Sequence, residues 1–174
     1  MSEKEVAGSL ESSQCVVFSL GDEWYGVDIF QVREIIRVPP VTKIPGAPYW
    51  AEGVINLRGG VIPVLDLRKR FGMPPGPEDA DRRIVVVELG DQTIGIVVDG
   101  VSEVLEIEAG AIEPPSPFVV PSGSGAVWGI AKVSDRLIIL LDLDAVLSGE
   151  EKERLKAMAD AGSSQANGEG AGAQ

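Results

Sequence analysis

Short stretches of alternating apolar and polar residues, separated by glycine turns, dominate the middle of this chain. In residues 15–20 the even-numbered positions are large and apolar, which places them on one side of an extended segment. Gly21-Asp22 follows, and a glycine at this point permits the positive φ that a tight turn requires. Residues 24–27 are again mostly apolar. The pattern predicts a β-hairpin.

The hairpin sequence occurs twice. Residues 16–36 align without a gap on residues 85–105 at an offset of 69 (85 − 16), and 8 of these 21 positions are identical. A second block, 53–67, matches 129–143 at an offset of 76 (129 − 53). Two similar halves predict two similar small folds side by side. Because units of this size are marginally stable alone, we expect them to share apolar surface at a seam.

The remaining segments add other elements. The apolar positions of 29–36 would share one face of a short helix that Asp28 caps. Residues 53–67 predict strand, turn and strand. Pro63 has no amide hydrogen, so we expect its strand at a sheet edge or bulged there. Many short strands and glycine turns favour an all-β protein with a few short helices, built as two small barrels of five strands.

The expected domain plan follows from these blocks. The first barrel spans about 15–80 and the second about 81–148, with strands allowed to cross between them. Ser148 and Glu151 have the spacing of a capping box, which predicts a C-terminal helix over 149–161. The tails, 1–14 and 162–174, are small and polar, and we expect both to be flexible.

Composition narrows the class of function. The formal net charge of −12 argues against nucleic acid, because phosphate binding needs clustered Lys and Arg. The longest apolar runs are far too short to cross a bilayer, and the N-terminus lacks the pattern of a secretory signal. These features predict a cytoplasmic protein that binds other proteins without inserting into a membrane.

Enzymatic chemistry has little support. The chain has no histidine and one cysteine, which excludes Ser/His and Cys/His nucleophile pairs and His-based or structural zinc sites. Cys15 is interpreted as a small residue at the start of a strand. Asp142 and Asp144 would share one face of a strand, but acids at strand ends are more often solvated or capping. We therefore expect no catalytic residue, no metal and no cofactor.

Arg58 is the most interesting charged residue. It lies at the predicted turn tip of Asn56–Gly60, beside glycines that leave the backbone accessible. It is either an ordinary exposed arginine or an anchor for a partner protein, since Arg is enriched at binding hot spots. The matching turn of the second half is Ser134-Asp135-Arg136, so the two halves differ here. Glu34 and Glu103 occupy matching positions and are either solvated or functional.

The motifs together resemble one family. LGDEWYGVDIFQVREIIR (20–37), GVINLRG and VIPVLDLR within 41–72, GIVVDGVSEVL (95–105) and SDRLIILLDLDAVL (134–147) resemble CheW, the coupling proteins of bacterial chemotaxis. The resemblance covers about residues 15–148. The regulatory domain of the kinase CheA and the protein CheV share the fold, but their additional domains have no counterpart in this sequence.

The resemblance implies a fold and a function. It implies two tandem five-stranded SH3-like barrels, packed side by side, in an adaptor without catalytic activity. The adaptor would bridge the cytoplasmic tips of methyl-accepting chemotaxis receptors to the CheA regulatory domain, in arrays at the inner face of the membrane. The positions matching the family's receptor-binding motif are Val32, Glu34, Gly53, Arg58, Val101 and Val104. Kinase-binding residues are not assigned.

Two alternatives remain open at this point. The first is a coupling protein of a non-flagellar chemosensory pathway, such as twitching motility, with the same fold and contacts. The second is an enzyme that uses acidic residues such as Asp142 and Asp144, which a metal or a pocket with convergent carboxylates would support.

Overall fold

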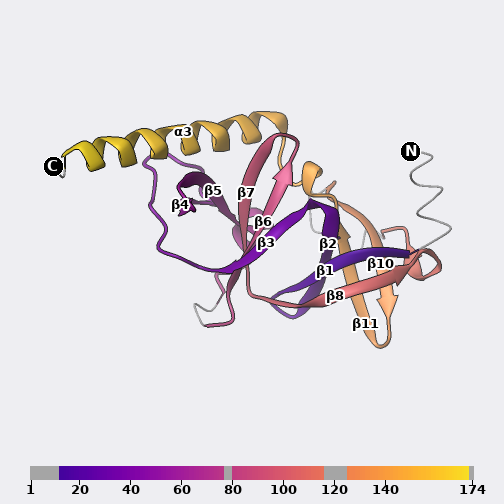
Figure 1. Ribbon diagram of the computed structural model, residues 1–174. Helices are drawn as coiled ribbons and strands as arrows, with labels where there is room; N and C mark the ends of the chain where they lie inside the picture. Colours follow the sequence, from indigo (N-terminus) through magenta and orange to yellow (C-terminus); the bar gives the residue numbers. More distant parts are fainter. Residues whose placement is uncertain (1–11, 77–79, 116–124, 173–174) are drawn as a thin grey trace.

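The computed structural model describes residues 12–76, 80–115 and 125–172. Two β-sheets lie side by side, and a long C-terminal helix crosses one of them (Figure 1). Each sheet curls into a small barrel, so the protein is all-β apart from short helical segments and the C-terminal helix, as predicted. The flexible tail expected at the N-terminus falls, over residues 1–11, outside the described residues.

In the part of the chain that the structure describes, the first sheet, barrel A, has six strands. Their order across the sheet is β8 (Gly100–Glu108), β1 (Ser12–Leu20), β2 (Glu23–Asp28), β11 (Arg136–Leu141), β10 (Val127–Val133) and β9 (Ile112–Glu113). Strand β9 has only two residues, so five strands build the body of this barrel. Ser12–Gln14 pair with β8, so part of the segment expected to be a flexible N-terminal tail is the beginning of β1.

The second sheet, barrel B, has five strands among the described residues. Their order is β3 (Val32–Arg37), β6 (Arg83–Leu89), β7 (Gln92–Val98), β5 (Gly60–Asp66) and β4 (Ala51–Leu57). Short helical segments join the strands: η1 (Ile29–Gln31), α2 (Leu67–Arg70), η2 (Ala109–Ala111) and η3 (Leu143–Ala145). Helix α3 (Gly149–Gly172) follows the last strand.

The two repeats exchange their first hairpins. Hairpin β1–β2 of the first repeat joins β10 and β11 of the second, through a parallel pair of β2 with β11. Hairpin β6–β7 of the second repeat joins β4 and β5 of the first, through a parallel pair of β7 with β5. Neither barrel is therefore one half of the chain. The expected division at residues 80 and 81 does not separate the sheets, because strands cross over in both directions.

Within the described residues, buried apolar side chains form three clusters. One fills barrel A around Val17, Ile138 and Leu140, and another fills barrel B around Ile55, Val64 and Val86. The largest lies between the barrels and contains residues from both sheets, as expected for small units that share apolar surface. The seam is thus a packed core.

The helix expected over 29–36 is wrong. Asp28 does cap a helical turn, accepting a hydrogen bond from the Phe30 amide at 2.9 Å, but only the three residues of η1 follow. The chain then extends as β3 and pairs with β6. Its β-branched residues Val32, Ile35 and Ile36 suit a strand, and β6 supplies the hydrogen bonds that a helix would have made internally.

Pro63 also departs from expectation. Its strand β5 lies between β7 and β4 rather than at an edge. Pro63 is opposite Val54 of β4, and pairing with β7 begins one residue later, at Val64. The irregularity of this hairpin lies in β4, between Ala51 and Gly53. A proline is tolerated here because it precedes the residues that pair on both sides.

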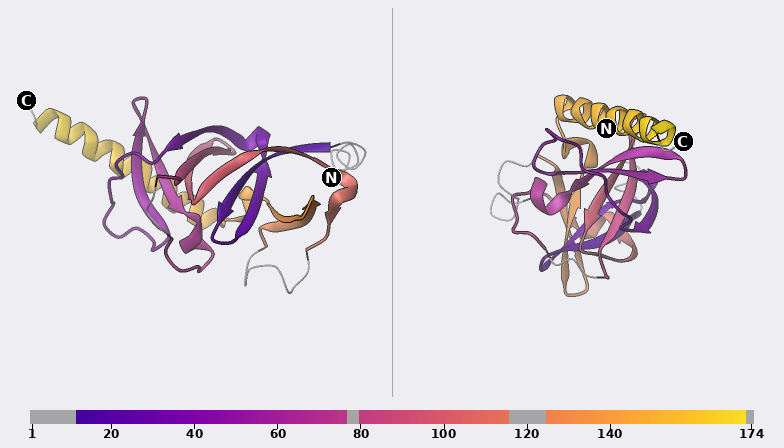
Figure 2. Two further views of the ribbon diagram at one scale, coloured as in Figure 1. Left: turned by 90° about the horizontal axis from the view of Figure 1, so that it is seen from below. Right: turned by 90° about the vertical axis from the view of Figure 1, so that its left-hand side faces the viewer.

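Helix α3 begins as predicted and ends later. The Glu151 amide donates to Ser148 Oγ at 3.1 Å, and the Ser148 amide donates to Glu151 Oε1 at 2.8 Å, which is the reciprocal geometry of a capping box. Leu155 and Met158 pack into the core at the seam. The helical backbone continues to Gly172, where a flexible tail from 162 was expected, and Figures 1 and 2 show it running past barrel B.

Candidate functional site

Glu34 and Arg58 form an ion pair that joins two strands of barrel B. Glu34 is on β3, and Arg58 lies in the turn between β4 and β5. Arg58 has φ 51° and Gly59 has φ 88°, values that a two-residue hairpin turn of type I′ requires. Asn56 Oδ1 accepts the Gly59 amide at 3.0 Å and fixes this turn. β3 and β4 are the outermost strands of the sheet, so the pair closes the gap between them.

Exposure differs within this pair. The Arg58 side chain is 67% exposed, whereas that of Glu34 is 24% exposed. Most of the Arg58 side chain is thus open to solvent, whereas the Glu34 carboxylate that it binds is largely covered. A guanidinium group presents five donors in a planar fork, so the remaining donors can bind a carboxylate of a partner.

The same kind of pair recurs in barrel A. Glu103 of β8 accepts from Arg136, which lies at the beginning of β11. Ser134, which matches Arg58, also has a positive φ of 54°, so the turn geometry is retained. In barrel A the guanidinium group belongs to Arg136, two residues after Ser134. It lies 5.0 Å from the centre of the Trp24 ring. The halves therefore differ in sequence at this turn but share the ion pair.

The three valines of the predicted site lie along the margin of the seam. Val32 and Val101, which match in the repeat, pack against the core between the barrels. Val104 on β8 is 50% exposed, and its counterpart Ile35 on β3 is 39% exposed. Sequence reasoning missed Ile35, although the repeat offset of 69 relates it to Val104. The apolar side chains of two outer strands, one from each barrel, thus border a seam whose middle is filled.

A hollow of about 390 Å³ opens beside this margin. Its lining includes Val101, Ser102, Trp24 and Arg83. Most of the residues that line it are polar, and Asp99 is among them.

Gly53 has a backbone role. It has φ 143°, and a Cβ atom added there would lie 2.1 Å from the Thr42 carbonyl oxygen. The next residue, Val54, exchanges two backbone hydrogen bonds with Thr42, at 2.9 and 2.8 Å. Gly53 is buried beneath this segment, so it affects the site through the position of β4 and not through a side-chain contact.

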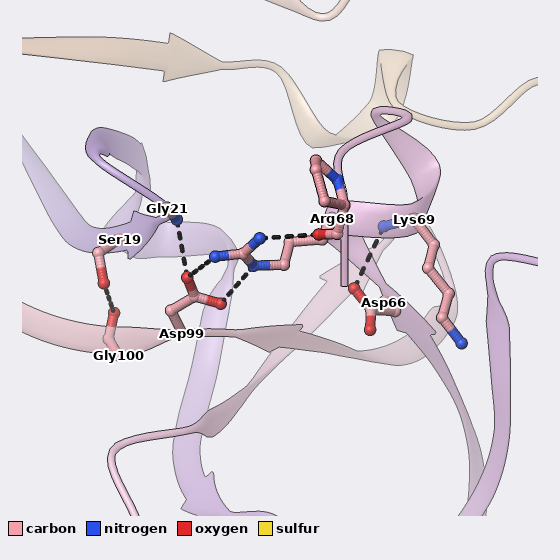
Figure 3. Close-up of polar contacts among 8 residues, drawn as sticks. Ser19, Gly21, Asp66, Arg68, Lys69, Asp99 and Gly100 are labelled. Carbon is pink, nitrogen blue, oxygen red and sulfur yellow. Dashed lines mark hydrogen bonds and ion pairs between the residues drawn. The ribbon is translucent and has the colours of Figure 1, made fainter. Parts of the chain in front are cut away.

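A network of polar side chains lies between the barrels (Figure 3). The Arg68 guanidinium donates to both carboxylate oxygens of Asp99, from Nε at 2.9 Å and from Nη2 at 2.6 Å. The Gly21 amide donates to Asp99 Oδ2 at 2.7 Å. Sequence reasoning did not single out Arg68 or Asp99, since the contact joins residues 31 positions apart.

The charge states in this network follow from its contacts. Burial by itself raises the pKa of Asp99, but hydrogen bonds from Arg68 and the Gly21 amide outweigh it, so the pKa lies below 3.8. The hydrogen bond with Asp99 raises the pKa of Arg68. Nearby, burial and the charge of Glu52 keep the pKa of Asp66 above 3.8, although backbone amides of α2 oppose them.

The acidic residues considered for catalysis do not form a site. β11 ends at Leu141, and Asp142 caps η3 by accepting the Asp144 amide at 3.1 Å. Asp144 accepts from Gln31 Nε2 at 3.4 Å and lies 3.7 Å from Lys152 Nζ. The expected shared strand face is therefore wrong. Within residues 12–76, 80–115 and 125–172, no three metal-binding side chains come together.

Cys15 is a buried strand residue. It lies in β1 and packs inside barrel A. Burial, with a smaller effect from Asp28, raises the pKa of its thiol to about 11. A thiol of this kind is a poor nucleophile at neutral pH. In the part of the chain that the structure describes, no helix combines the length and apolar character needed to span a bilayer.

The fold described above defines a class of protein: two SH3-like barrels packed side by side. Residues 14–151 match the CheW-like domain, and the chain belongs to this family. It is 37% identical to the chemotaxis protein CheW of Klebsiella aerogenes over 147 residues, covering 84% of this chain and 89% of that protein.

Two further comparisons extend this assignment. The crystal structure of the scaffolding protein TtCheW from Thermoanaerobacter tengcongensis superimposes with a TM-score of 0.74 at 44% identity, covering 80% of this chain and 97% of that one. The chain is also 32% identical to Protein PilI of Pseudomonas aeruginosa over 93 residues, covering 53% of this chain and 52% of that protein.

Proposed function

We propose that this protein is a chemotaxis adaptor that couples methyl-accepting chemotaxis receptors to the histidine kinase CheA by binding both. The proposal depends on one observation: Arg58 is 67% exposed while it forms an ion pair with Glu34, between the outermost strands of barrel B. The relatives named as chemotaxis proteins match about four fifths of this chain. The match to Protein PilI spans about half, so chemotaxis is the pathway we propose.

The docking surface combines Val32, Glu34, Arg58, Val101 and Val104, with Gly53 supporting it from within. A receptor tip is a helical hairpin, which can lay an apolar stripe against a groove or margin lined by apolar side chains. The valines of β3 and β8 offer such a margin, and Arg58 offers donors to a carboxylate beside the stripe. Apolar contact and a directional ion pair together fix the register of the hairpin.

The kinase is the second partner. Its regulatory domain shares the two-barrel fold, and it pairs barrel to barrel with the adaptor at surfaces distinct from the receptor site. The adaptor has no catalytic role and acts in the cytoplasm, where receptor binding brings it to the inner face of the membrane. The affinity of each single contact is modest, and simultaneous binding of many partners within an array makes the assembly stable.

Arg58→Glu tests the receptor side of this proposal. The substitution places a second carboxylate beside that of Glu34, at the point where a partner carboxylate binds. We expect the affinity for a receptor-tip fragment to fall on the order of 30-fold or more, the effect of losing a hot-spot residue. Isothermal titration calorimetry with the receptor tip and, separately, with the kinase regulatory domain measures both contacts.

The control is Lys132→Glu, which makes the same charge change at an exposed ion pair with Glu113 in barrel A. It should leave both affinities near those of the unmodified protein. Unchanged receptor binding by the Arg58 variant, or its failure to fold, would contradict the proposed role of Arg58 as a receptor contact.

A further inference from the structure

The two parts of the docking surface belong to different barrels. Glu34 and Arg58 are in barrel B, whereas Val101 and Val104 are on β8 of barrel A. The distance between the charged and apolar contacts therefore depends on how the barrels are oriented. A rigid hairpin can engage both parts only when this orientation is correct.

The core between the barrels is closely packed, and a directional contact at its edge adds to the restraint on their orientation. Apolar burial supplies most of the attraction between the barrels, but it is non-directional. A bidentate pair between a guanidinium and a carboxylate is directional, because two parallel hydrogen bonds fix the relative position of both groups.

Arg68 and Asp99 provide such a pair across the seam (Figure 3). Arg68 lies on α2, directly after strand β5 of barrel B. Asp99 connects β7 of barrel B to β8 of barrel A, and Gly21, whose amide it accepts, is the turn of hairpin β1–β2 in barrel A. The carboxylate thus receives hydrogen bonds from both barrels at once.

The surroundings hold these groups in place. The side chains of Arg68 and Asp99 are only 13% and 17% exposed. Arg68 Nη1 also donates to the Pro74 carbonyl at 2.8 Å, and Gly76 lies so close that an added Cβ would be 2.3 Å from Arg68 Nε. The Asp99 amide donates to the Ser19 carbonyl at 3.0 Å, which fixes the start of β8 two residues before Val101.

We propose that Arg68 and Asp99 are positioning residues that lock the orientation of the two barrels and thereby set the spacing between the Arg58 and Val101–Val104 parts of the docking surface. The link to receptor binding rests on the proposed function. The link to barrel orientation stands on the contacts alone.

Residual dipolar couplings test the orientation, because they report the relative alignment of two bodies in solution. The variants are Asp99→Asn, which keeps the shape and removes the charge, and Arg68→Lys, which keeps the charge and removes the bidentate geometry. The control is Lys132→Gln, which breaks the exposed pair with Glu113 inside barrel A. Affinity for a receptor-tip fragment and the melting temperature are measured on the same samples.

We expect both Arg68 and Asp99 variants to show a changed or averaged orientation, with each barrel's own couplings retained. Receptor-tip affinity should fall on the order of tenfold, within the usual range of coupling between two distinct sites of a protein. The control should match the unmodified protein in orientation and affinity.

Two results would decide against the proposal, and a third would decide against the proposed function. A lower melting temperature with unchanged orientation and affinity would make the pair merely stabilising. A changed orientation with unchanged affinity would break the link to docking. If the unmodified protein does not bind the receptor tip, the proposed function fails, and the couplings still decide whether the pair orients the barrels.

Discussion

At the residue scale, the two barrels share the turn conformation and an Arg–Glu ion pair, although the residue at the turn differs. Arg58 and Ser134 occupy equivalent turn positions, and both have a positive φ that non-glycine residues seldom adopt. The guanidinium group of the second barrel comes from Arg136 instead. Because the arginine side chain is long, two backbone positions can deliver its charge to equivalent glutamates.

The differences between the two pairs have a consequence for binding. Arg136 lies over Trp24 and its side chain is 28% exposed, whereas that of Arg58 is 67% exposed. Arg58 has no ring contact among the described interactions. Under the proposed function, the more exposed Arg58 is the arginine that a partner carboxylate reaches.

Gly53→Ala is expected to destabilise the fold strongly. The added methyl group would overlap the Thr42 carbonyl, and φ 143° is strained for any residue with a Cβ atom. Strain and displacement of a hydrogen-bonded segment should lower the free energy of unfolding by about 2–4 kcal/mol. Urea denaturation measures this loss.

The matched control is Gly110→Ala, where the added Cβ meets no atom within 4 Å and φ is not positive. Its stability should stay within about 1 kcal/mol of the unmodified protein. Equal effects at both positions would show that the contact with Thr42 does not matter.

The Arg68–Asp99 pair predicts a pH dependence of stability. The pKa of Asp99 is lower in the folded protein than in the unfolded chain. Its contribution is therefore present above about pH 4 and disappears as pH falls through the folded-state pKa. The surrounding charges are Arg82, which favours the carboxylate, and Asp66 and Asp22, which favour the charged Arg68.

Asp99→Asn removes this titration. We expect the variant to be less stable than the unmodified protein by about 1.5–3 kcal/mol between pH 5 and 7, the range for hydrogen bonds to charged groups. The difference should shrink below about pH 4. Chemical denaturation at a series of pH values measures it, and a constant difference down to pH 2 would contradict the assigned charge state.

At the element scale, residues 29–36 show a conflict between local pattern and pairing. Their apolar spacing is compatible with one face of a helix, and Asp28 supplies a genuine cap. Only the exchange of hairpins between repeats places β6 beside them. Since that partner lies about fifty residues further along the chain, the local pattern cannot reveal the strand.

Helix α3 shows the opposite case, in which a local signal is sufficient. Ser148 and Glu151 satisfy each other's backbone amides, and Glu151 also binds Arg70 at 2.9 Å. The end of the helix was not evident, because glycine and serine after Ala161 have low helix propensity. Gly162 instead packs closely against Val54 and Val61, which permits the helix to cross barrel B.

Ser148→Ala is expected to weaken the start of α3. Loss of the hydroxyl leaves the Glu151 amide without its cap, which should reduce stability by about 0.5–2 kcal/mol. Thermal unfolding followed by circular dichroism measures the change. Ser148→Thr retains the hydroxyl and should restore most of the stability; equal losses in both variants would exclude the capping contact as the cause.

At the scale of the whole molecule, the exchange of hairpins makes the halves interdependent. Each barrel takes strands from both repeats, and the largest apolar cluster lies between the barrels. The two repeats are therefore interlocked, and neither barrel is complete without strands from both. The proposed docking surface depends on this interlocked arrangement, because its two parts lie on different barrels.

Residues 1–80 and 81–174, produced separately, should therefore be unfolded. Each fragment lacks the hairpin that completes its barrel and exposes apolar strands. When mixed or co-expressed, the fragments should associate and regain β-structure. Heteronuclear NMR spectra of each fragment and of the mixture measure this, and dispersed amide signals from either fragment alone would contradict it.

The sequence by itself determined the repeat, the hairpins at Gly21 and Gly90, the capping box at Ser148 and the family. These features depend on neighbouring residues or on a pattern that the chain displays twice. It also placed Glu34 and Arg58 in the candidate site, but not as partners.

Only the tertiary structure decided which strands share a barrel and that Arg68 binds Asp99 across the seam. It also decided that Arg136, and not a residue at the turn position of Ser134, forms the ion pair with Glu103. Each of these contacts joins segments far apart in the chain. Local propensity does not encode such contacts, because they arise only when buried apolar surface and paired backbone groups select one arrangement of the whole molecule.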